Sequence, residues 1–551
     1  MSEQCQICFA SAAQWEADSL EDHIVNAHGG DEPSVRAIYG DEFAYLFGDA
    51  DDAPEADGPD DSGRNGGDSG GPPAGNGIGD TGGAGAAAGG GAGAVDDEMY
   101  GRKWFLVGVG GAGNNIVDAV LMRRDTLSRN HEDRARIWEG GLAGYGLLNT
   151  NIAELEQTYY AKELKQYSRN DLLSNSIIGF GKHGYSGMGY RWSNGAKVAE
   201  ADFADGANPF RDRWDMTQQD IRDAQAIMMV HSVTKGTGCG ATPVITDKIR
   251  EHVLEDDLVI DKAILSSVVI PSEGGKQSEV GGRAKTNGVV GLARISRAAD
   301  ALIPFNNDHL RLASKDITPR IDNLDRYNPP EYVDLNKPLV AFLEAFTMSS
   351  TPQLTDQDAT MTIRGSVFDV ADSFRLVEDK YPHDMDADER PAVVLAPALG
   401  RLRSNDINES SLELLARNTI LQNRLADFDP STAWGGNFMV YGPEEKMEEV
   451  SAYVTDGTLQ SILNGEEFLD SANTAGVETV DVQVNQLVIP YLDDVFMWGT
   501  LWNPRMPSLE SMYDHAKRLK DEGQTSQAED LREVWGEVES LFSCLGRDNM
   551  L

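Results

Sequence analysis

Lysine, cysteine and long apolar runs are all scarce in this 551-residue chain. Only 16 of the 47 basic residues are lysine, whereas 90 residues are Asp or Glu, which gives a formal net charge of −43. No uncharged apolar run approaches about 18 residues, which excludes a transmembrane helix. The opening residues MSEQCQICFA lack the basic and apolar segments of a secretory signal. We therefore expect a cytoplasmic protein.

The acidic residues are spread along the chain rather than gathered in one block. A dispersed acidic surface that is poor in lysine keeps a protein hydrated in molar salt, where the Debye length falls to about 3 Å. This pattern predicts a protein from the cytoplasm of an extreme halophile, and it argues against binding to a nucleic-acid backbone. Four cysteines, of which Cys5 and Cys8 lie three apart, argue against a disulfide framework and for a reducing compartment.

Composition divides the chain into five predicted parts. Residues 1–47 are mixed, and residues 48–98 consist almost wholly of Gly, Asp, Ala, Pro and Ser. The second segment cannot bury enough apolar surface to offset its ordering entropy, so we expect a flexible linker. We expect a nucleotide-binding domain over 99–384, a smaller α/β domain over 385–504 and closing helices over 505–551.

From residue 99 on, short apolar segments alternate with helical patterns, which predicts an α/β fold with a doubly wound parallel sheet. The strands expected in the first domain are 103–108, 146–150, 176–181, 226–233, 263–270 and 301–305, and a helix is expected over 114–123. In the smaller domain we expect strands at 391–400, 437–442 and 480–492, with helices at 410–425 and 444–463. Further helices are expected over 508–545.

Two glycine-rich segments follow predicted strands at the points where helices begin. The first contains Gly110, Gly111, Ala112, Gly113, Asn114 and Asn115, and the second contains Gly236, Thr237, Gly238, Cys239 and Gly240. Such turns present backbone N–H groups and a positive helix terminus to an anion. The first segment alone also fits the dinucleotide site of an oxidoreductase. Two such segments in one sheet suit a nucleotide with a long phosphate tail.

In this order the two segments resemble those of the tubulin and FtsZ family of GTPases. GTGCGATPVI is similar to the family's signature loop GGGTGTG, and GVGGAGNN is similar to its first loop. The resemblance extends over about 104–376 and more loosely to about 500, and a dinucleotide-dependent oxidoreductase has no equivalent of the second loop. Thr234 and Lys235 stand where the family has glycine, and Cys239 replaces a threonine. Lys235 could pair with a phosphate or lie at the surface.

Further residues follow in the family's order. Thr150 and Asn151 resemble its NTD segment, and the residues around 184–189 diverge from its loop that senses the terminal phosphate. Pro271 and Glu273 resemble the ribose loop PFxFEG, in which the acid accepts hydrogen bonds from ribose hydroxyls. Tyr332 and Asn336 resemble a Tyr–Asn pair at a helix start, which would stack on a purine and bond its edge. The resemblance implies GTP or GDP as ligand, with Mg²⁺ or K⁺ beside it.

The family completes its site with an acidic loop of the next subunit, whose carboxylates act on the attacking water. Asp369 and Asp372 have the D-x-x-D spacing of that loop, although Val367 stands at its Asn position. The resemblance therefore implies hydrolysis completed by assembly. In a chain with 90 acidic residues, a solvated surface loop is an equal alternative.

Near the N-terminus, Cys5, Cys8, His23 and His28 have the order and spacing of a C2H2 zinc finger. Two thiolates and two imidazoles suit tetrahedral Zn²⁺, and so short a unit would fold only around the metal. A single finger reads about three base pairs, and Glu16, Asp18, Glu21 and Asp22 stand between the ligand pairs with no Lys or Arg. We therefore expect a protein partner rather than DNA.

Together these features predict a GTP-binding, GTP-hydrolysing protein that forms nucleotide-dependent filaments in cell division, cell shape or a cytoskeleton. Its partners would be copies of itself, head to tail, or related subunits. The alternative is a non-polymerising regulator or adaptor whose finger recruits a protein. Lys235, the divergent residues around 184–189 and Val367 favour that alternative.

Overall fold

The structure is a computed structural model of the chain, and it describes residues between 103 and 547. The residues left out of that range are 131–140, 165–176, 182–186, 205–206, 208, 213–220, 222–223, 252–261, 272–280, 314–316, 351–363, 366–389, 465–480 and 490–491. The chain divides into two compact units, Met1–Gly91 and Ala92–Leu551, and all described residues belong to the second. The predicted zinc finger and linker thus lie outside the described residues and stay predictions.

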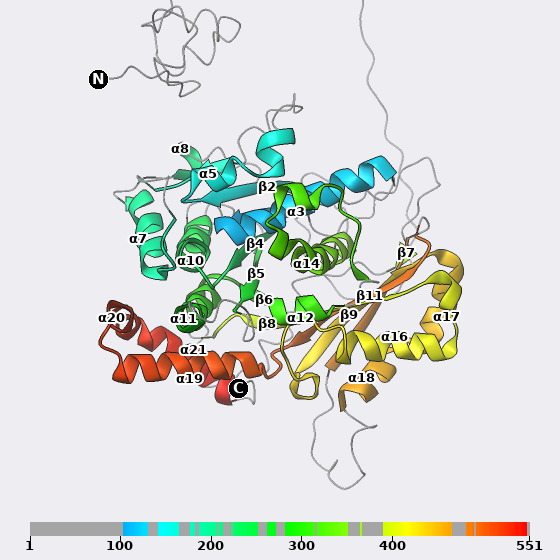
Figure 1. Ribbon diagram of the computed structural model, residues 1–551. Coiled ribbons are helices and arrows are strands. Elements are labelled where there is room, and N and C mark those ends of the chain that lie inside the picture. Colours follow the sequence, from blue (N-terminus) through cyan, green and yellow to red (C-terminus); the bar gives the residue numbers. More distant parts are fainter. Residues whose placement is uncertain are drawn as a thin grey trace, which may run out of the picture. The chain divides into compact units, whose positions relative to one another are not determined.

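A mostly parallel sheet runs through the described unit (Figure 1). Its first strands are β1 (Trp104–Val109), β2 (Leu142–Asn149), β3 (Ile177–Gly179), β4 (Ala226–Ser232), β5 (Ala263–Ile270) and β6 (Ala301–Asn306). They lie side by side in the order β3-β2-β1-β4-β5-β6, and every neighbouring pair is parallel. The predicted α/β class with a doubly wound parallel sheet is confirmed.

The sheet continues into the C-terminal half. Its strands there are β8 (Val393–Leu402), β11 (Val495–Trp502), β9 (Gly435–Gly442), β10 (Asp481–Val488) and the short β7 (Arg364–Gly365). β8 extends the parallel array through two residue pairs with β6, and β11 runs antiparallel between β8 and β9. All 11 strands of the described residues therefore form one sheet.

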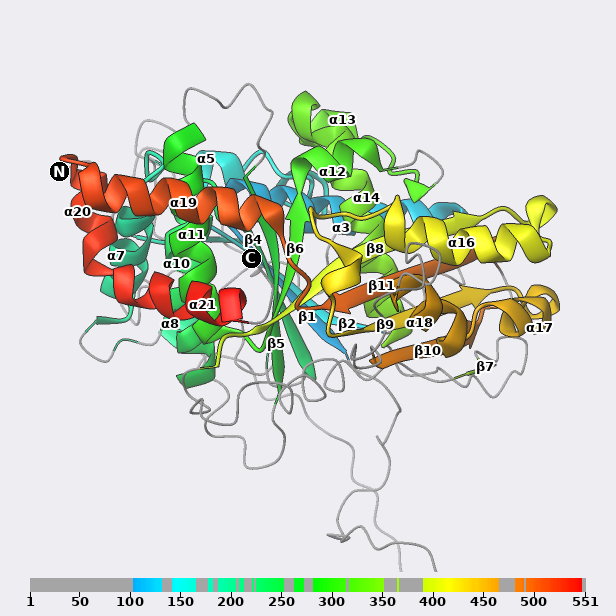
Figure 2. The ribbon, with the colours of Figure 1, turned by 90° about the horizontal axis from the view of Figure 1, so that it is seen from below.

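Helices cover both faces of the sheet, because successive strand residues point to opposite sides. Phe105, Val107 and Val109 of β1 enter one buried apolar cluster, whereas Trp104 and Leu106 enter the other. The first cluster lies under α7 (Trp192–Asp202), α10 (Thr237–Ile249), α11 (Gly281–Ala298) and the C-terminal helices α19 (Pro507–Glu522), α20 (Ser526–Glu533) and α21 (Trp535–Arg547) (Figure 2). The second lies under α3 (Gly110–Asn130), α12 (Asn307–Leu312), α13 (Leu324–Tyr327) and α14 (Pro330–Ser349).

Helix α14 joins the two halves of the sheet at its C-terminal end. The Trp104 indole of β1 donates to Ser350 Oγ at 2.7 Å, and the Trp498 indole of β11 donates to Ser349 Oγ at 2.8 Å. Phe346 of the same helix packs against both indoles, with ring centroids 5.6 and 5.1 Å away. Residues from both halves thus share one buried aromatic cluster.

Several predicted bounds differ from those in the structure. The first helix spans Gly110–Asn130 instead of 114–123, and the helix expected over 410–425 is α16 (Glu409–Leu421). The helix expected over 444–463 is two helices, α17 (Glu444–Tyr453) and α18 (Asp456–Asn464). They separate where Thr455 Oγ1 accepts the Thr458 N–H at 3.2 Å and so starts a new helix. The strand β11 was missing from the prediction.

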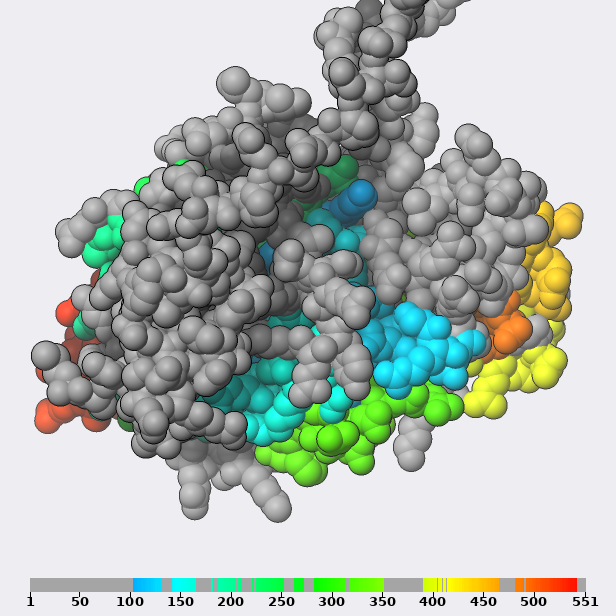
Figure 3. Space-filling model, turned by 90° about the horizontal axis from the view of Figure 1, so that it is seen from above, coloured from blue at the N-terminus to red at the C-terminus, as the bar shows by residue number. Residues whose placement is uncertain are grey.

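Short helices form some of the remaining connections. They are α5 (Ile152–Leu155) after β2, a π-helical turn at Tyr160–Leu164, and α8 (Pro209–Asp212). The rings of Tyr159, beside α5, and Tyr327 of α13 meet edge to face with centroids 5.2 Å apart. Figure 3 shows the same contact at the surface, where the cyan segment that carries Tyr159 adjoins the green segment of α13.

Candidate nucleotide-binding site

The strand order reverses between β1 and β4, which makes this pair the switch point of the sheet. Ligands of doubly wound sheets bind at such a point, in the crevice outside the carboxyl ends of the strands. Helix α3 begins directly after β1, and α10 begins at Thr237, five residues after β4 ends at Ser232. Both helix N-termini therefore face the same crevice.

The predicted glycine segments meet there. A Cβ placed on Gly110 would lie 2.9 Å from the Gly238 nitrogen, and one placed on Gly238 would lie 3.0 Å from the Val109 carbonyl oxygen. Gly110 also adopts a φ of 74°, which side-chain-bearing residues rarely do. The hydroxyls of Thr150 and Thr237 lie 2.8 Å apart and connect the loop after β2 to the other two. Only glycine permits so close an approach of the backbones.

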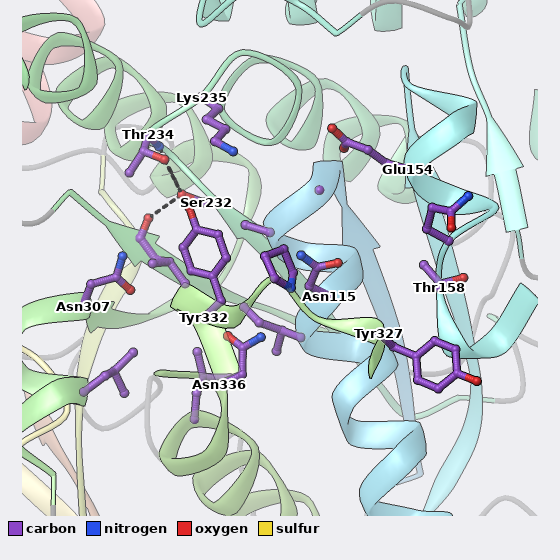
Figure 4. Close-up of a pocket in the computed structure, with 18 of the residues that line it drawn as sticks. Asn115, Glu154, Thr158, Ser232, Thr234, Lys235, Asn307, Tyr327, Tyr332 and Asn336 are labelled. Atoms are coloured by element: carbon purple, nitrogen blue, oxygen red, sulfur yellow. Dashed lines mark hydrogen bonds between the residues drawn. The ribbon is translucent and has the colours of Figure 1, made fainter. Parts of the chain in front are cut away.

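Two cavities of about 340 and 330 Å³ open above these loops. Both are lined by Gly111, Ala112, Glu154, Ser232 and Lys235, so they are contiguous. The smaller one, which we call the loop cavity, is otherwise lined by the two glycine segments, Asn149, Asn151 and residues 187–190. The larger one, which we call the α14 cavity, reaches the first turns of α14 (Figure 4).

Most of the predicted nucleotide-binding residues lie at these cavities. The lining includes Gly110, Gly111, Ala112, Asn115, Asn151, Gly236, Thr237, Gly238, Tyr332 and Asn336. A second group lies directly behind them: Gly113, Asn114, Thr150, Cys239, Gly240 and Pro271. Asn114, for example, donates from Nδ2 to the Leu148 carbonyl at 3.0 Å and so holds α3 against β2. Glu273, Asp369 and Asp372 lie outside the described residues.

Cys239 is a packing residue of the second glycine segment. Its thiol is buried and donates to the Asn287 carbonyl at 3.1 Å, and burial raises the pKa of the thiol far above its ordinary value. The sulfur therefore stays protonated at neutral pH. Its side chain thus supports the loop from behind.

His231, on β4, supports the same loop. Its Nδ1–H donates to the Gly238 carbonyl at 3.0 Å, and its Nε2 accepts from the Ser266 hydroxyl at 2.8 Å. Because a carbonyl can only accept, this pairing requires the Nδ1–H tautomer. Burial lowers the pKa of His231 to about 3, so the ring is neutral. It orients the loop and adds no charge to it.

The α14 cavity combines an aromatic ring with several side-chain amides. Tyr332 and Asn336 stand one turn apart near the start of α14, and Figure 4 shows both facing the pocket. Asn336 Nδ2 donates to Asn328 Oδ1 at 2.8 Å. The Asn328 Nδ2 group is buried and has no hydrogen-bond partner among the described residues. Asn307 lines the same cavity from the start of α12.

Sequence reasoning missed several residues of the lining, chiefly Glu154, Gln157, Thr158 and Tyr327. They lie on or near α5 and on α13, which carry no glycine motif. Glu154 Oε2 accepts from Asn149 Nδ2 at 2.9 Å, and Asn149 ends β2. The one available signal was position, because a short polar helix after a strand next to the switch point must border the crevice.

A buried carboxylate holds the segment that carries Gln157 and Thr158. Asp118 of α3 is 1 % exposed and accepts the N–H groups of Tyr159 at 2.7 Å and Tyr160 at 2.9 Å. Burial raises the pKa of Asp118 to about 7, and the two backbone hydrogen bonds act in the opposite direction. The carboxyl thus anchors this wall of the pocket to α3.

The chain is similar to known proteins in sequence and in fold. Residues 103–314 match the model of the Tubulin/FtsZ family, GTPase domain. The CetZ2 protein of Haloferax volcanii, solved as a GTPγS-bound protofilament, is 16% identical, with a TM-score of 0.50 over 77% of this chain and 100% of its own. CetZ from Methanosaeta thermophila is 16% identical, with a TM-score of 0.48 over 80% of this chain and 98% of its own. An FtsZ dimer from M. jannaschii is 19% identical, with a TM-score of 0.43 over 73% of this chain and 88% of its own.

The fold is that of a doubly wound α/β protein with a crevice at the switch point of its sheet. More narrowly, residues 103–314 are similar to the GTPase domain of the Tubulin/FtsZ family. None of the described helices is both long and apolar enough to cross a membrane.

Proposed function

We propose that this protein binds and hydrolyses GTP and assembles head to tail into filaments with cytoskeletal roles. The observation that carries the proposal is the pair of contiguous cavities at the switch point. The loop cavity offers backbone N–H groups to phosphates, and the α14 cavity offers a ring and amides to a base. One extended nucleotide spans both.

The phosphates would lie against the N-termini of α3 and α10. Helices of 21 and 13 residues direct their positive ends and free N–H groups at the loop cavity. Neither helix has an acidic residue in its first turn. The glycine segments let an anion approach the backbone closely.

The base would lie in the α14 cavity, with Tyr332 against its face. Guanine presents both donors and acceptors on its edge, and a side-chain amide supplies both types. Asn336 and Asn307 line this cavity, and the unpaired donor of Asn328 lies beside Asn336. This set favours guanine over adenine, while Glu273 stays our proposed ribose contact.

A magnesium ion suits the same site. Mg²⁺ usually binds through one or two carboxylates together with substrate phosphates. Glu154 supplies one carboxylate at both cavities, and the described residues contain no cluster of three or more His, Cys, Asp or Glu that would form a dedicated cage. We therefore propose that the ion enters with the nucleotide and supplies charge neutralisation at the phosphates; K⁺ is the other candidate.

Hydrolysis would require a neighbouring subunit. We propose that Asp369 and Asp372 of one chain position water at the nucleotide of the next, because head-to-tail contacts are heterologous and place two different surfaces together. The similarity in fold to CetZ2 of Haloferax volcanii, which was solved as a protofilament, supports this part of the proposal. Related subunits could take the place of identical ones.

Two features of the sequence favour a second function class. Lys235 lines both cavities and Thr234 lines the α14 cavity, at positions where the family has glycine. The N-terminal Cys5, Cys8, His23 and His28 would hold Zn²⁺ and recruit a protein. A GTP-binding adaptor that neither hydrolyses nor polymerises would fit both features. Zinc near one atom per chain, lost in a Cys5→Ser/Cys8→Ser variant, would support the finger itself.

The decisive experiment measures nucleotide and turnover together in molar KCl. Protein denatured after purification should release GTP or GDP, and GTP turnover per chain should rise with protein concentration. Release of NAD, or equal affinity for ATP and GTP, would contradict the guanine site.

Mixing variants tests the shared site. Asp372→Ala should bind GTP but lose turnover by about 10²–10⁴-fold, as loss of a general base does. Tyr332→Ala should fail to bind nucleotide while keeping its acidic loop, so a mixture of the two should regain activity. Tight GTP binding without turnover or filaments would favour the adaptor.

A further inference from the structure

Lys235 occupies the junction of the two cavities. It precedes Gly236 in the turn between β4 and α10, and it lines both the loop cavity and the α14 cavity. Among the described residues of the two linings, Lys235 is the only cation and Glu154 the only anion. Figure 4 shows these two side chains extending into the same end of the pocket from opposite sides.

The lysine is held beside an aromatic ring at the rim. Its Nζ lies 5.9 Å from the centroid of the Tyr190 ring, within the range of a cation–π contact. Tyr190 lines the loop cavity and adopts a φ of 60°, which is rare for an aromatic residue. Such a conformation persists where the surroundings enforce it.

One side chain enforces the placement of both residues. Asn287 of α11 donates from Nδ2 to the Tyr190 carbonyl at 3.0 Å and to the Thr234 carbonyl at 3.1 Å. The loop that carries Tyr190 and the turn that carries Lys235 are thus tied to the same amide. A Cβ on Gly236 would lie 2.6 Å from the Met188 Cβ, so the two segments also touch directly.

From this geometry we infer that Lys235 binds the nucleotide's phosphates directly and that Tyr190 is a positioning residue for its ammonium group. The inference rests on the proposed function, because it assigns a contact within that site. An ammonium group offers three donors, and hydrogen bonds to charged groups are about twice as strong as neutral ones. Glycine at this position supplies backbone N–H alone.

Because of the surrounding charge, the contribution of Lys235 to affinity should depend on the number of phosphates in the ligand. A chain with a net charge of −43 repels a polyphosphate, and Glu154 adds a carboxylate at the site itself. A single cation at the junction offsets that repulsion only for ligands that carry phosphate. Guanosine, GMP, GDP and GTP therefore separate the role of Lys235 from that of the base pocket.

The test is the affinity of the full-length protein for these four ligands, by calorimetry in molar KCl with Mg²⁺ present. Lys235→Met removes the charge and keeps most of the stem, and Lys197→Met, on the exposed side of α7, is its matched control. Lys235→Met should lower affinity for GTP by about ten- to a hundredfold, as loss of a hydrogen bond to a charged group does. Its affinity for guanosine, and every affinity of Lys197→Met, should equal the wild-type value.

The positioning role has its own variants. Tyr190→Phe keeps the ring face and should bind GTP as wild type does, whereas Tyr190→Leu keeps the backbone strain and loses the ring face. The latter should weaken GTP binding about two- to fivefold, the worth of an exposed cation–π contact. In a Lys235→Met background, Tyr190→Leu should have no further effect on GTP affinity.

Two results would overturn the inference: an unchanged GTP affinity in Lys235→Met, or an equal loss for all four ligands including guanosine. A thermal unfolding curve for each variant shows whether the fold is retained, and Lys235→Arg should recover part of the GTP affinity. If wild-type protein itself binds neither GDP nor GTP, the proposed function fails before Lys235 is tested.

Discussion

Single glycines allow the close backbone packing of the two glycine segments. Gly240, in the first turn of α10, faces α7 so closely that an added Cβ would lie 1.9 Å from the Trp192 carbonyl oxygen. Gly536, in the first turn of α21, has no atom within 4 Å of the same position. The two helical glycines therefore form a matched pair.

Gly240→Ala should destabilise the fold by about 1–3 kcal/mol, because an overpacked site must shift its neighbours. Gly536→Ala should leave stability unchanged or raise it by up to about 1 kcal/mol, since alanine favours helix. Urea unfolding followed by circular dichroism measures both. Equal behaviour of the two variants would show that α7 yields freely to α10.

Asp118 gives the pocket wall a pH dependence with a definite sign. Its folded-state pKa of about 7 lies above the ordinary 3.8, so between these values the folded protein keeps a proton that the unfolded chain has released. Its contribution to stability is complete below about pH 3.8 and is lost as the pH rises through about 7. Asn at this position cannot ionise.

We therefore expect the stability of Asp118→Asn, relative to wild type, to improve steadily between about pH 4 and 7. The lowered pKa of His231 acts with the opposite sign but is common to both proteins and cancels in the difference. Unfolding free energies at several pH values measure this. A difference that is constant with pH would contradict an ionisable Asp118.

At the residue scale, the sequence predicted those site residues that local sterics dictate. Gly110, Gly236 and Gly238 are read from sequence because only glycine fits where backbones touch. Glu154 and Tyr327 could not be predicted as pocket residues from the sequence, because their presence at the pocket depends on how α5 and α13 pack. The sequence showed that Lys235 replaces a glycine of the family. It could not show where the lysine side chain points, because that depends on the loop around Tyr190.

At the scale of elements, α3 and α14 are joined by a buried ion pair. Arg123 Nε lies 2.7 Å from Glu344 Oε2, both side chains are buried, and Arg123 also donates to the Arg320 carbonyl at 3.0 Å. The pair links α3, which begins at the loop cavity, to α14, whose first turns line the α14 cavity.

Removing one partner leaves a buried charge uncompensated, so Glu344→Ala should cost about 3–5 kcal/mol of stability. Asp334→Ala breaks the exposed ion pair with Lys337 on the same helix and should cost at most about 1 kcal/mol. Arg123→Met/Glu344→Leu should recover most of the loss, because apolar groups replace both charges. Chemical unfolding measures all three, and a cost for Glu344→Ala no larger than that for Asp334→Ala would contradict the buried pair.

The elements themselves were predicted best where the pattern is local. Continuous apolar runs gave β1, β4, β5 and β6 within one or two residues, because strands buried on both faces are apolar throughout. β11 was missed because VFMWGTLW follows another apolar run closely and was not separated from the loop before the last helices. The pairing of β8 with β6, which unites the sheet, is a long-range contact that no local pattern specifies.

At the scale of the whole molecule, the net charge of −43 predicts that the stability of the fold depends on salt. The acidic side chains of α17 show how the charge is arranged: Glu444, Glu445, Glu448 and Glu449 are exposed, while Met447 and Val450 face the core. Like charges at such spacing repel one another until counter-ions screen them. The compact state should therefore be more stable in concentrated salt.

We expect the unfolding temperature to rise with KCl through the molar range. Replacing the four exposed glutamates of α17 by glutamine should flatten this rise, because fewer charges then need screening. Replacing them by aspartate keeps the charge and should retain the full salt dependence, which makes it the matched control. Thermal unfolding by circular dichroism across a KCl series measures all three proteins. An unfolding temperature that is insensitive to KCl would contradict the halophilic interpretation, while glutamine and aspartate variants with equal slopes would place the salt requirement elsewhere on the surface.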